Sequence, residues 1–157
     1  RSFMATTSTL LFCAAILNAN LPIRPKPLIP IFVFISNFIS MLCQDYTYER
    51  FKNIHVLWSV RIKEEILAFD EFLKSLPIHY IPIVTRDERW DGETNRISNL
   101  IKDGIIIKDG TPETDKIMLC GNMEFNIEIR DEMISRGWIE GSNRQQGSFL
   151  LEKAFVG

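Results

Sequence analysis

The stretch NIHVLWSVRIKEEILAFDEFLKSLPIHYIPIVT, residues 53–85, decides the fold class. Its two ends, 53–59 and 79–85, are rich in β-branched and other apolar residues, which is typical of strands buried on both faces. Between these ends, apolar residues recur at helical spacing with acidic residues among them, which predicts a helix over 62–76. A strand, a helix and a second strand in this order indicate two parallel strands joined by a crossover helix.

The rest of the chain continues this alternation of strands and helices. Further strands are predicted at 31–35, 116–120 and 148–156, and further helices from Ser36, over 96–103 and over 123–136. Gly104 and Gly137 stand where the last two helices are expected to end, since glycine readily adopts the left-handed backbone of a helix C-terminus. The pattern predicts an α/β fold with a doubly wound, Rossmann-like sheet of about five mostly parallel strands and helices on both faces.

The composition is that of a globular protein but changes along the chain. The 157 residues suit one domain, and the net charge of −2 argues against a nucleic-acid-binding protein. All 20 acidic residues lie at or after Asp45, and all 8 glycines lie at or after Gly92. The chain therefore consists of two differently composed pieces.

Two uncharged stretches, 2–23 and 28–44, precede the acidic part of the chain. Each is close to the ~20 apolar residues that cross a bilayer, so a membrane anchor is one interpretation. A signal peptide is another interpretation of the first stretch. For the second stretch, the alternative is a buried strand at 31–35 that runs into a short helix.

The cysteines and histidines do not form a recognisable catalytic or metal-binding pattern. Cys13, Cys43 and Cys120 are odd in number and lack the spacing of metal ligands, which favours a reducing compartment such as the cytoplasm and no metal site. His55 and His79 stand inside apolar runs and are predicted to be packed or half-exposed strand residues. No nucleophile–base pair stands out, so any chemistry is expected to come from a cofactor.

Several cationic and polar residues follow directly after the predicted strands. Ligands of open parallel sheets bind beyond the carboxyl ends of the strands, so these residues are expected to meet at one edge. Guanidinium and hydroxyl groups bind phosphate oxygens, and a helix that begins after a glycine turn offers free N–H groups to an anion. The inferred ligand is a phosphorylated nucleotide, although each arginine taken alone is more typical of a solvated surface charge. The residues concerned are Arg61, Thr85, Arg86, Arg96, Gly121 and Asn122.

Short motifs occur in a characteristic order in the second piece of the chain. They are SVR (59–61), VTRDE (84–88), RISNLI (96–101), PETDKIMLCG (112–121), LCGNMEF (119–125) and EKAFVG (152–157). In order and approximate spacing, residues 38–157 resemble the C-terminal NADP-binding domain of bacterial ferredoxin (flavodoxin)–NADP reductases. The resemblance implies an oxidoreductase that transfers hydride between NADP(H) and FAD, with ferredoxin or flavodoxin as electron partner. It also implies a further partner, because this chain contains no counterpart of the family's flavin-binding barrel domain.

The resemblance implies a role for each candidate residue. Arg61 would contact NADP, and three residues would hold the 2′-phosphate of the adenosine ribose. These three are Thr85, Arg86 and Arg96. Because two guanidiniums repel each other when the phosphate between them is missing, NADP is expected to bind in preference to NAD. Cys120 would lie beside the nicotinamide, together with Gly121.

The end of the chain is expected to lie against the flavin. By resemblance, the flavin ring would be covered by Ala154, Phe155, Val156 and Gly157. Glu152, in the same motif, would assist electron or proton transfer, which makes it a candidate catalytic residue together with the cysteine beside the nicotinamide.

The first 37 residues do not resemble the family. Its members carry a glycine-rich turn, T-G-T-G-x-A-P, before the segment that matches 38–42, whereas residues 29–37 contain no glycine. Bulky side chains in this turn are expected to obstruct the close approach of a cofactor to the backbone. The chain is therefore interpreted as a divergent apolar head, 1–37, and an NADP(H)-binding reductase domain, 38–157. The alternatives are an inactive remnant of the reductase and a membrane-tethered nucleotide-binding protein.

Overall fold

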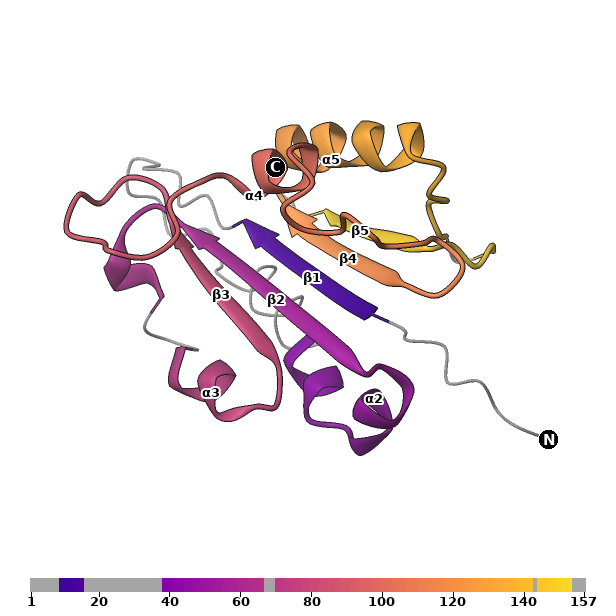
Figure 1. The fold of residues 1–157 in the computed structure, drawn as a ribbon, viewed down its shortest axis with the longest axis horizontal. Helices are drawn as coiled ribbons and strands as arrows, with labels where there is room; N and C mark the ends of the chain where they lie inside the picture. Colours follow the sequence, from indigo (N-terminus) through magenta and orange to yellow (C-terminus); the bar gives the residue numbers. More distant parts are fainter. Residues whose placement is uncertain (1–8, 16–37, 67–69, 143, 154–157) are drawn as a thin grey trace, which may run out of the picture.

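The computed structural model describes residues 9–15, 38–66, 70–142 and 144–153. They form one sheet of parallel strands in the order β3-β2-β1-β4-β5 (Figure 1). The strands are β1 (Thr9–Ala15), β2 (Asn53–Val60), β3 (His79–Val84), β4 (Lys116–Gly121) and β5 (Phe149–Lys153). The predicted α/β class is confirmed.

The middle strand of the sheet is not among the predicted strands. β2, β3, β4 and β5 occupy predicted positions, whereas the strand predicted at 31–35 lies outside the described residues. β1 instead comes from the first 37 residues, which the sequence sets apart as an apolar head. It pairs with β2 on one side and with β4 on the other, so that segment supplies the strand that joins the two halves of the sheet.

Short helices connect the strands. The helical segments are 38–42, α2 (Asp45–Arg50), the 3₁₀ helix η1 (Lys63–Glu65), α3 (Asp70–Ser75), α4 (Ile97–Lys102) and α5 (Met123–Ser135). The prediction of one helix that begins at residue 62 is wrong, because Ile62 has an extended backbone and is 41% exposed. Here the Glu65 carboxylate accepts a hydrogen bond from the backbone N–H of Arg61 at 3.0 Å. This bond closes a local turn in place of a longer helix.

The two helices of the second half end as predicted. Gly104 follows α4 with φ of 66°, and Gly137 follows α5 with φ of 83°. Both values lie in the left-handed region that favours glycine over residues with a Cβ atom.

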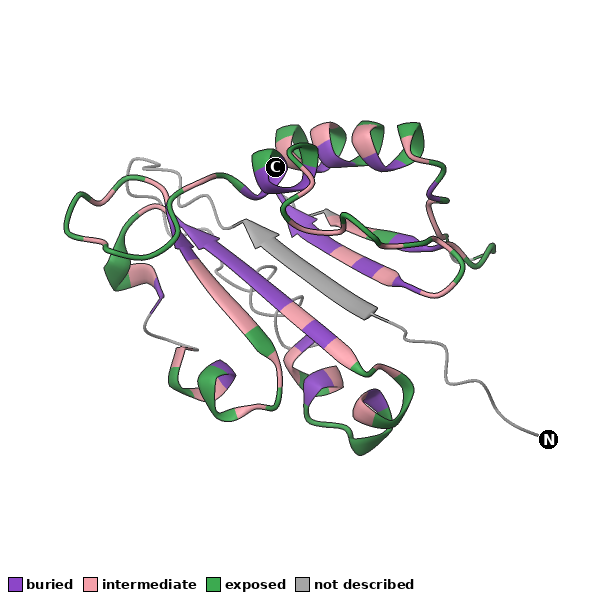
Figure 2. Ribbon diagram, viewed as in Figure 1, coloured by how far each residue is buried: buried purple, intermediate pink, exposed green. Residues whose placement is uncertain are grey.

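Two hydrophobic cores lie on opposite faces of the sheet. Because successive strand residues point to opposite faces, β2 places Val56 and Trp58 in one core and Leu57 in the other. The first core includes side chains of residues 38–42 and α3, and the second includes side chains of α4 and α5. Figure 2 shows β2 buried along most of its length, as expected for a strand covered on both faces.

The two histidines lie on neighbouring strands of the sheet. His55 and His79 are partners in register on β2 and β3, half-buried and exposed respectively, with their rings stacked 4.7 Å apart. This agrees with their prediction as strand residues. Among the described residues, no helix combines the length and the apolar character needed to cross a membrane.

The strand order fixes where a ligand can bind. From β1 the chain moves outward to β2 and β3, and it then returns past β1 to β4 and β5. The connections on the two sides of β1 therefore lead in opposite directions, which leaves a crevice beyond the carboxyl ends of the strands.

Candidate functional site

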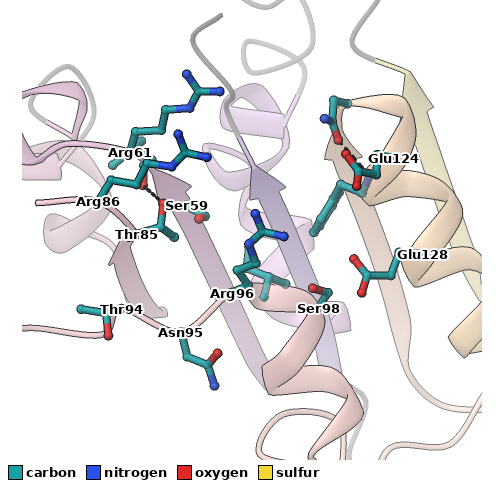
Figure 3. Close-up of a pocket in the computed structure, with 14 residues that line it drawn as sticks. Ser59, Arg61, Thr85, Arg86, Thr94, Asn95, Arg96, Ser98, Glu124 and Glu128 are labelled. Atoms are coloured by element: carbon teal, nitrogen blue, oxygen red, sulfur yellow. Dashed lines mark hydrogen bonds between the residues drawn. The ribbon is translucent and has the colours of Figure 1, made fainter.

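A cavity of about 260 Å³ lies at the carboxyl ends of β2 and β3, against α4 and the first turns of α5 (Figure 3). Five of the predicted binding residues line it, namely Arg61, Thr85, Arg86, Arg96 and Asn122. The structure thus brings these five residues together at the strand ends. Their roles as cofactor-binding residues stay predictions.

Backbone pairing beyond the ends of β2 and β3 places two of the arginines next to each other. The Thr85 N–H donates to the Val60 carbonyl at 3.0 Å, and the Arg86 N–H donates to the Arg61 carbonyl at 2.9 Å. The Thr85 hydroxyl also donates to the Val60 carbonyl, at 3.2 Å. In Figure 3 the side chains of Arg61 and Arg86 accordingly lie on the same side of the cavity.

The loop between β3 and α4 carries Arg96 to the cavity and is tied down at both ends. Asp87 accepts the N–H of Lys63 at 3.3 Å and pairs with the Arg89 guanidinium at 2.8 Å. These bonds, chiefly the one from the Arg89 side chain, hold the pKa of Asp87 well below its usual range. Nearer the cavity, the Glu93 carbonyl accepts a hydrogen bond from the last residue of β3 at 3.0 Å. The loop is therefore fixed relative to the strand ends.

The turn from β4 into α5 forms the opposite wall. Asn122 caps the helix, because its side-chain oxygen accepts the Phe125 N–H at 2.8 Å. The Phe125 ring lines the cavity and lies so close to Gly121 that a Cβ atom at residue 121 would overlap it. Gly121 is not itself a lining residue, so the glycine contributes by admitting the ring.

The two predicted catalytic residues, Cys120 and Glu152, do not line this cavity. They are partners in register on β4 and β5, and Cys120 belongs to the core on the face away from α4 and α5. Burial, together with the Glu152 carboxylate, raises the pKa of the Cys120 thiol to about 11, and burial raises the pKa of Glu152. The thiol is therefore protonated at neutral pH. The predicted flavin-covering residues, 154–157, lie outside the described residues.

Asn126 of α5 joins the ends of β4 and β5. Its side-chain nitrogen donates to the carbonyls of Gly121 and Glu152, both at 3.1 Å. Since a carbonyl cannot donate, these bonds fix the orientation of the amide. The side-chain oxygen is buried and has no hydrogen-bond partner among the described residues. Asn126 is missing from the predicted site; an amide at a buried helix position was the available signal.

Two acidic residues of α5, Glu124 and Glu128, also line the cavity and were not predicted as site residues. Their spacing of four residues places them on one face of the helix, which the sequence pattern could have shown. Ser59 and Ser98 are further lining residues. Among the described residues, no three metal-ligating side chains come together.

Comparison with known proteins relates the chain to one group of flavoproteins. No family model matches the chain. It is 28% identical over 140 residues to the flavodoxin/ferredoxin–NADP reductase of Rhodobacter capsulatus, an alignment that covers 78% of this chain and 51% of the relative. It is 30% identical over 141 residues to ferredoxin–NADP reductase A of Sorangium cellulosum, covering 78% of this chain and 50% of the relative. The chain thus spans about half the length of these relatives.

Solved structures give the same result. A ferredoxin NADP⁺ reductase from Neisseria gonorrhoeae, crystallised with bound FAD and NADP, matches with a TM-score of 0.71 and 25% identity. The match covers 95% of this chain and 56% of that one. A flavohemoglobin from Malassezia yamatoensis shares the fold alone, with a TM-score of 0.54 and 16% identity over 95% of this chain and 32% of its own. By sequence and by fold, the chain is therefore similar to about half of a ferredoxin–NADP reductase.

Proposed function

We propose that this chain is the NADP(H)-binding part of a flavin-dependent ferredoxin/flavodoxin–NADP reductase. The observation that carries the proposal is the gathering of Arg61, Arg86 and Arg96 in one cavity at the carboxyl edge of a parallel sheet. This is the edge at which open α/β sheets bind their ligands. Support comes from the homologous reductase of Neisseria gonorrhoeae, which binds FAD and NADP.

The cavity fits one phosphorylated half of a dinucleotide. Its volume of about 260 Å³ lies just below the range of roughly 300–1,000 Å³ for ligand pockets. One guanidinium group can donate two parallel hydrogen bonds to a phosphate, and the Thr85 hydroxyl adds a neutral donor. Arg86 is exposed and forms no ion pair with any residue in the described ranges. We assign the 2′-phosphate to Thr85, Arg86 and Arg96, and a further NADP contact to Arg61.

The second part of the proposal concerns the ends of β4 and β5. NADP(H) supplies a hydride donor or acceptor when it is bound. Cys120 and Gly121 would lie beside its nicotinamide, where the protonated thiol offers an uncharged, poorly solvated surface. Glu152, whose pKa is raised by burial, is suited to hold a proton at its carboxyl group. The following residues, 154–157, would cover the flavin.

The partners follow from the same proposal. The chain spans about half the length of its relatives, so a flavin-binding domain would be its structural partner. Ferredoxin or flavodoxin would be its electron partner. A cytoplasmic location stays a prediction.

Calorimetric titration of the chain with NADP⁺, and with NAD⁺ as a comparison, tests the proposal at low salt. We expect saturable NADP⁺ binding and at least about ten-fold weaker NAD⁺ binding, since charge-assisted hydrogen bonds contribute about 1.5–3 kcal/mol each. Arg86→Ala should abolish the preference for NADP⁺. The matched control is Arg130→Ala, which removes an exposed arginine paired with Glu140 outside the cavity. No binding to a sample with native circular dichroism would refute the proposal and favour an inactive remnant.

A further inference from the structure

The cavity has a cationic side and an acidic side. Figure 3 shows Arg61 and Arg86 on one side, at the ends of β2 and β3, and Glu124 and Glu128 on the other, on α5. Arg96 lies between the two sides. Phosphate binding uses the arginines and the Thr85 hydroxyl, so it does not account for two carboxylates in the same cavity.

Glu128 is held in place in its ionised form. Lys102 of α4 pairs with it, with Nζ at 2.6 Å from Oε1. The pKa of Glu128 is lowered, chiefly by this hydrogen bond and further by the Ser98 hydroxyl and the charge of Arg96, although partial burial acts in the opposite direction. Glu128 lines the cavity and Lys102 does not. A ligand inside the cavity therefore meets the carboxylate rather than the ammonium group.

An ionised carboxylate opposite the arginines restricts how negative charge can be distributed in a ligand. A single phosphate held by Thr85, Arg86 and Arg96 is attracted by the two guanidinium groups. A chain of phosphates that extends across the cavity brings its further charges towards Glu124 and Glu128, where like charges repel. Sugar hydroxyl groups in that position would instead donate hydrogen bonds to the carboxylates.

We propose that Glu128, supported by Glu124, is a specificity-determining residue that rejects nucleoside triphosphates. The favoured ligand has one phosphate beside the arginines and presents a hydroxyl-bearing sugar to α5. A 2′-phosphorylated nucleotide meets this requirement, because its remaining phosphates are attached on the other side of the ribose. The inference rests on the proposed function, since it requires that the arginines bind a nucleotide phosphate.

The test compares the binding of 2′,5′-ADP and ATP to the full chain by calorimetry, at low salt and without divalent metal ions. Glu128→Gln removes the charge from the cavity. Lys102→Met breaks the same ion pair between α4 and α5 but leaves the carboxylate in the cavity. Asp131→Asn is the matched control, because it removes an exposed negative charge of α5 outside the cavity.

The measured quantity is the ratio of the Kd of ATP to the Kd of 2′,5′-ADP. We expect this ratio to fall about five-fold in Glu128→Gln, to rise in Lys102→Met and to stay within about two-fold in Asp131→Asn. An unchanged ratio in Glu128→Gln would overturn the inference. Equal shifts in Glu128→Gln and Lys102→Met would also overturn it, because loss of the ion pair would then be the cause. Failure of the unmodified, folded chain to bind 2′,5′-ADP would instead overturn the proposed function, and the inference with it.

Discussion

Replacing Asn126 by aspartate is expected to destabilise the fold strongly at neutral pH and much less in acid. Asn126→Asp replaces a donor by a carboxylate oxygen beside the carbonyls of Gly121 and Glu152, which lie 3.1 Å from the present amide nitrogen. Two hydrogen bonds are lost, together about 2 kcal/mol. The new carboxylate must also stay charged next to two carbonyls or take up a proton. With an ordinary pKa of about 3.9, protonation at about pH 7.5 costs about 5 kcal/mol, which is the upper limit of this second effect.

The pH dependence has a definite sign. The folded state raises the pKa of the new carboxyl group, so the folded variant binds more protons than the unfolded one. Its stability therefore falls as the pH rises from the ordinary pKa to the raised one. At about pH 4.5 the cost of protonation is only about 1 kcal/mol, and a protonated carboxyl donates again to one of the two carbonyls.

Urea unfolding, followed by the fluorescence of the buried Trp58 and Trp138, measures this effect relative to the unmodified chain. Asn126→Leu is the control. It removes both hydrogen bonds without adding a charge and also removes the unpartnered side-chain oxygen, so a loss of about 2 kcal/mol or less, independent of pH, is expected. The reasoning is refuted if Asn126→Asp loses less than about 1 kcal/mol near neutral pH, or loses the same amount at both pH values.

Three further predictions concern the same edge of the sheet. Gly121→Ala should displace the Phe125 ring from the cavity wall and weaken 2′,5′-ADP binding several-fold in calorimetry; unchanged affinity would contradict the packing argument. Glu152→Gln removes one of the two causes that raise the pKa of the Cys120 thiol, so the thiol should ionise below the present pKa of about 11. Thiolate absorbance, taken as the difference from a Cys120→Ala variant, measures this shift, and a constant pKa would leave burial as its sole cause. Asp87→Asn should loosen the loop between β3 and α4, with faster amide hydrogen exchange in the loop and weaker nucleotide binding; unchanged exchange would show that other contacts hold it.

Local pattern predicts the strands that are flanked by charged or glycine-containing segments, and it fails where such flanks are missing. β2 and β3 are bounded by polar residues and separated by a helical pattern, so their positions follow from the sequence. β1 lies inside the uncharged stretch 2–23, whose composition is equally typical of a membrane segment, a signal peptide and a buried strand. Pairing with β2 and β4 selects the strand, and such distant partners are not visible in a local window.

Some residues of the candidate site could also be predicted from the sequence, and others could not. The arginines were predicted because the ends of parallel strands must meet at one edge, which depends on the fold class alone. Asn126 and Glu128 were missed because their contacts depend on how α5 packs against β4, β5 and α4. Helical spacing in a sequence shows which residues share a face of the helix, but it does not show which face lines a cavity.

The central position of β1 also has a consequence for how the chain folds. Leu10 pairs with Ile54 on one side and with Lys116 on the other, so β1 finds its second partner roughly a hundred residues later in the sequence. Pairings between such distant segments are slow, because much of the chain must be ordered before they form. Until β4 arrives, the edge of β1 that it will cover has unpaired N–H and C=O groups and can pair with other chains. During synthesis the middle of this sheet is therefore expected to be its most aggregation-prone part, although in the folded protein it is paired on both sides.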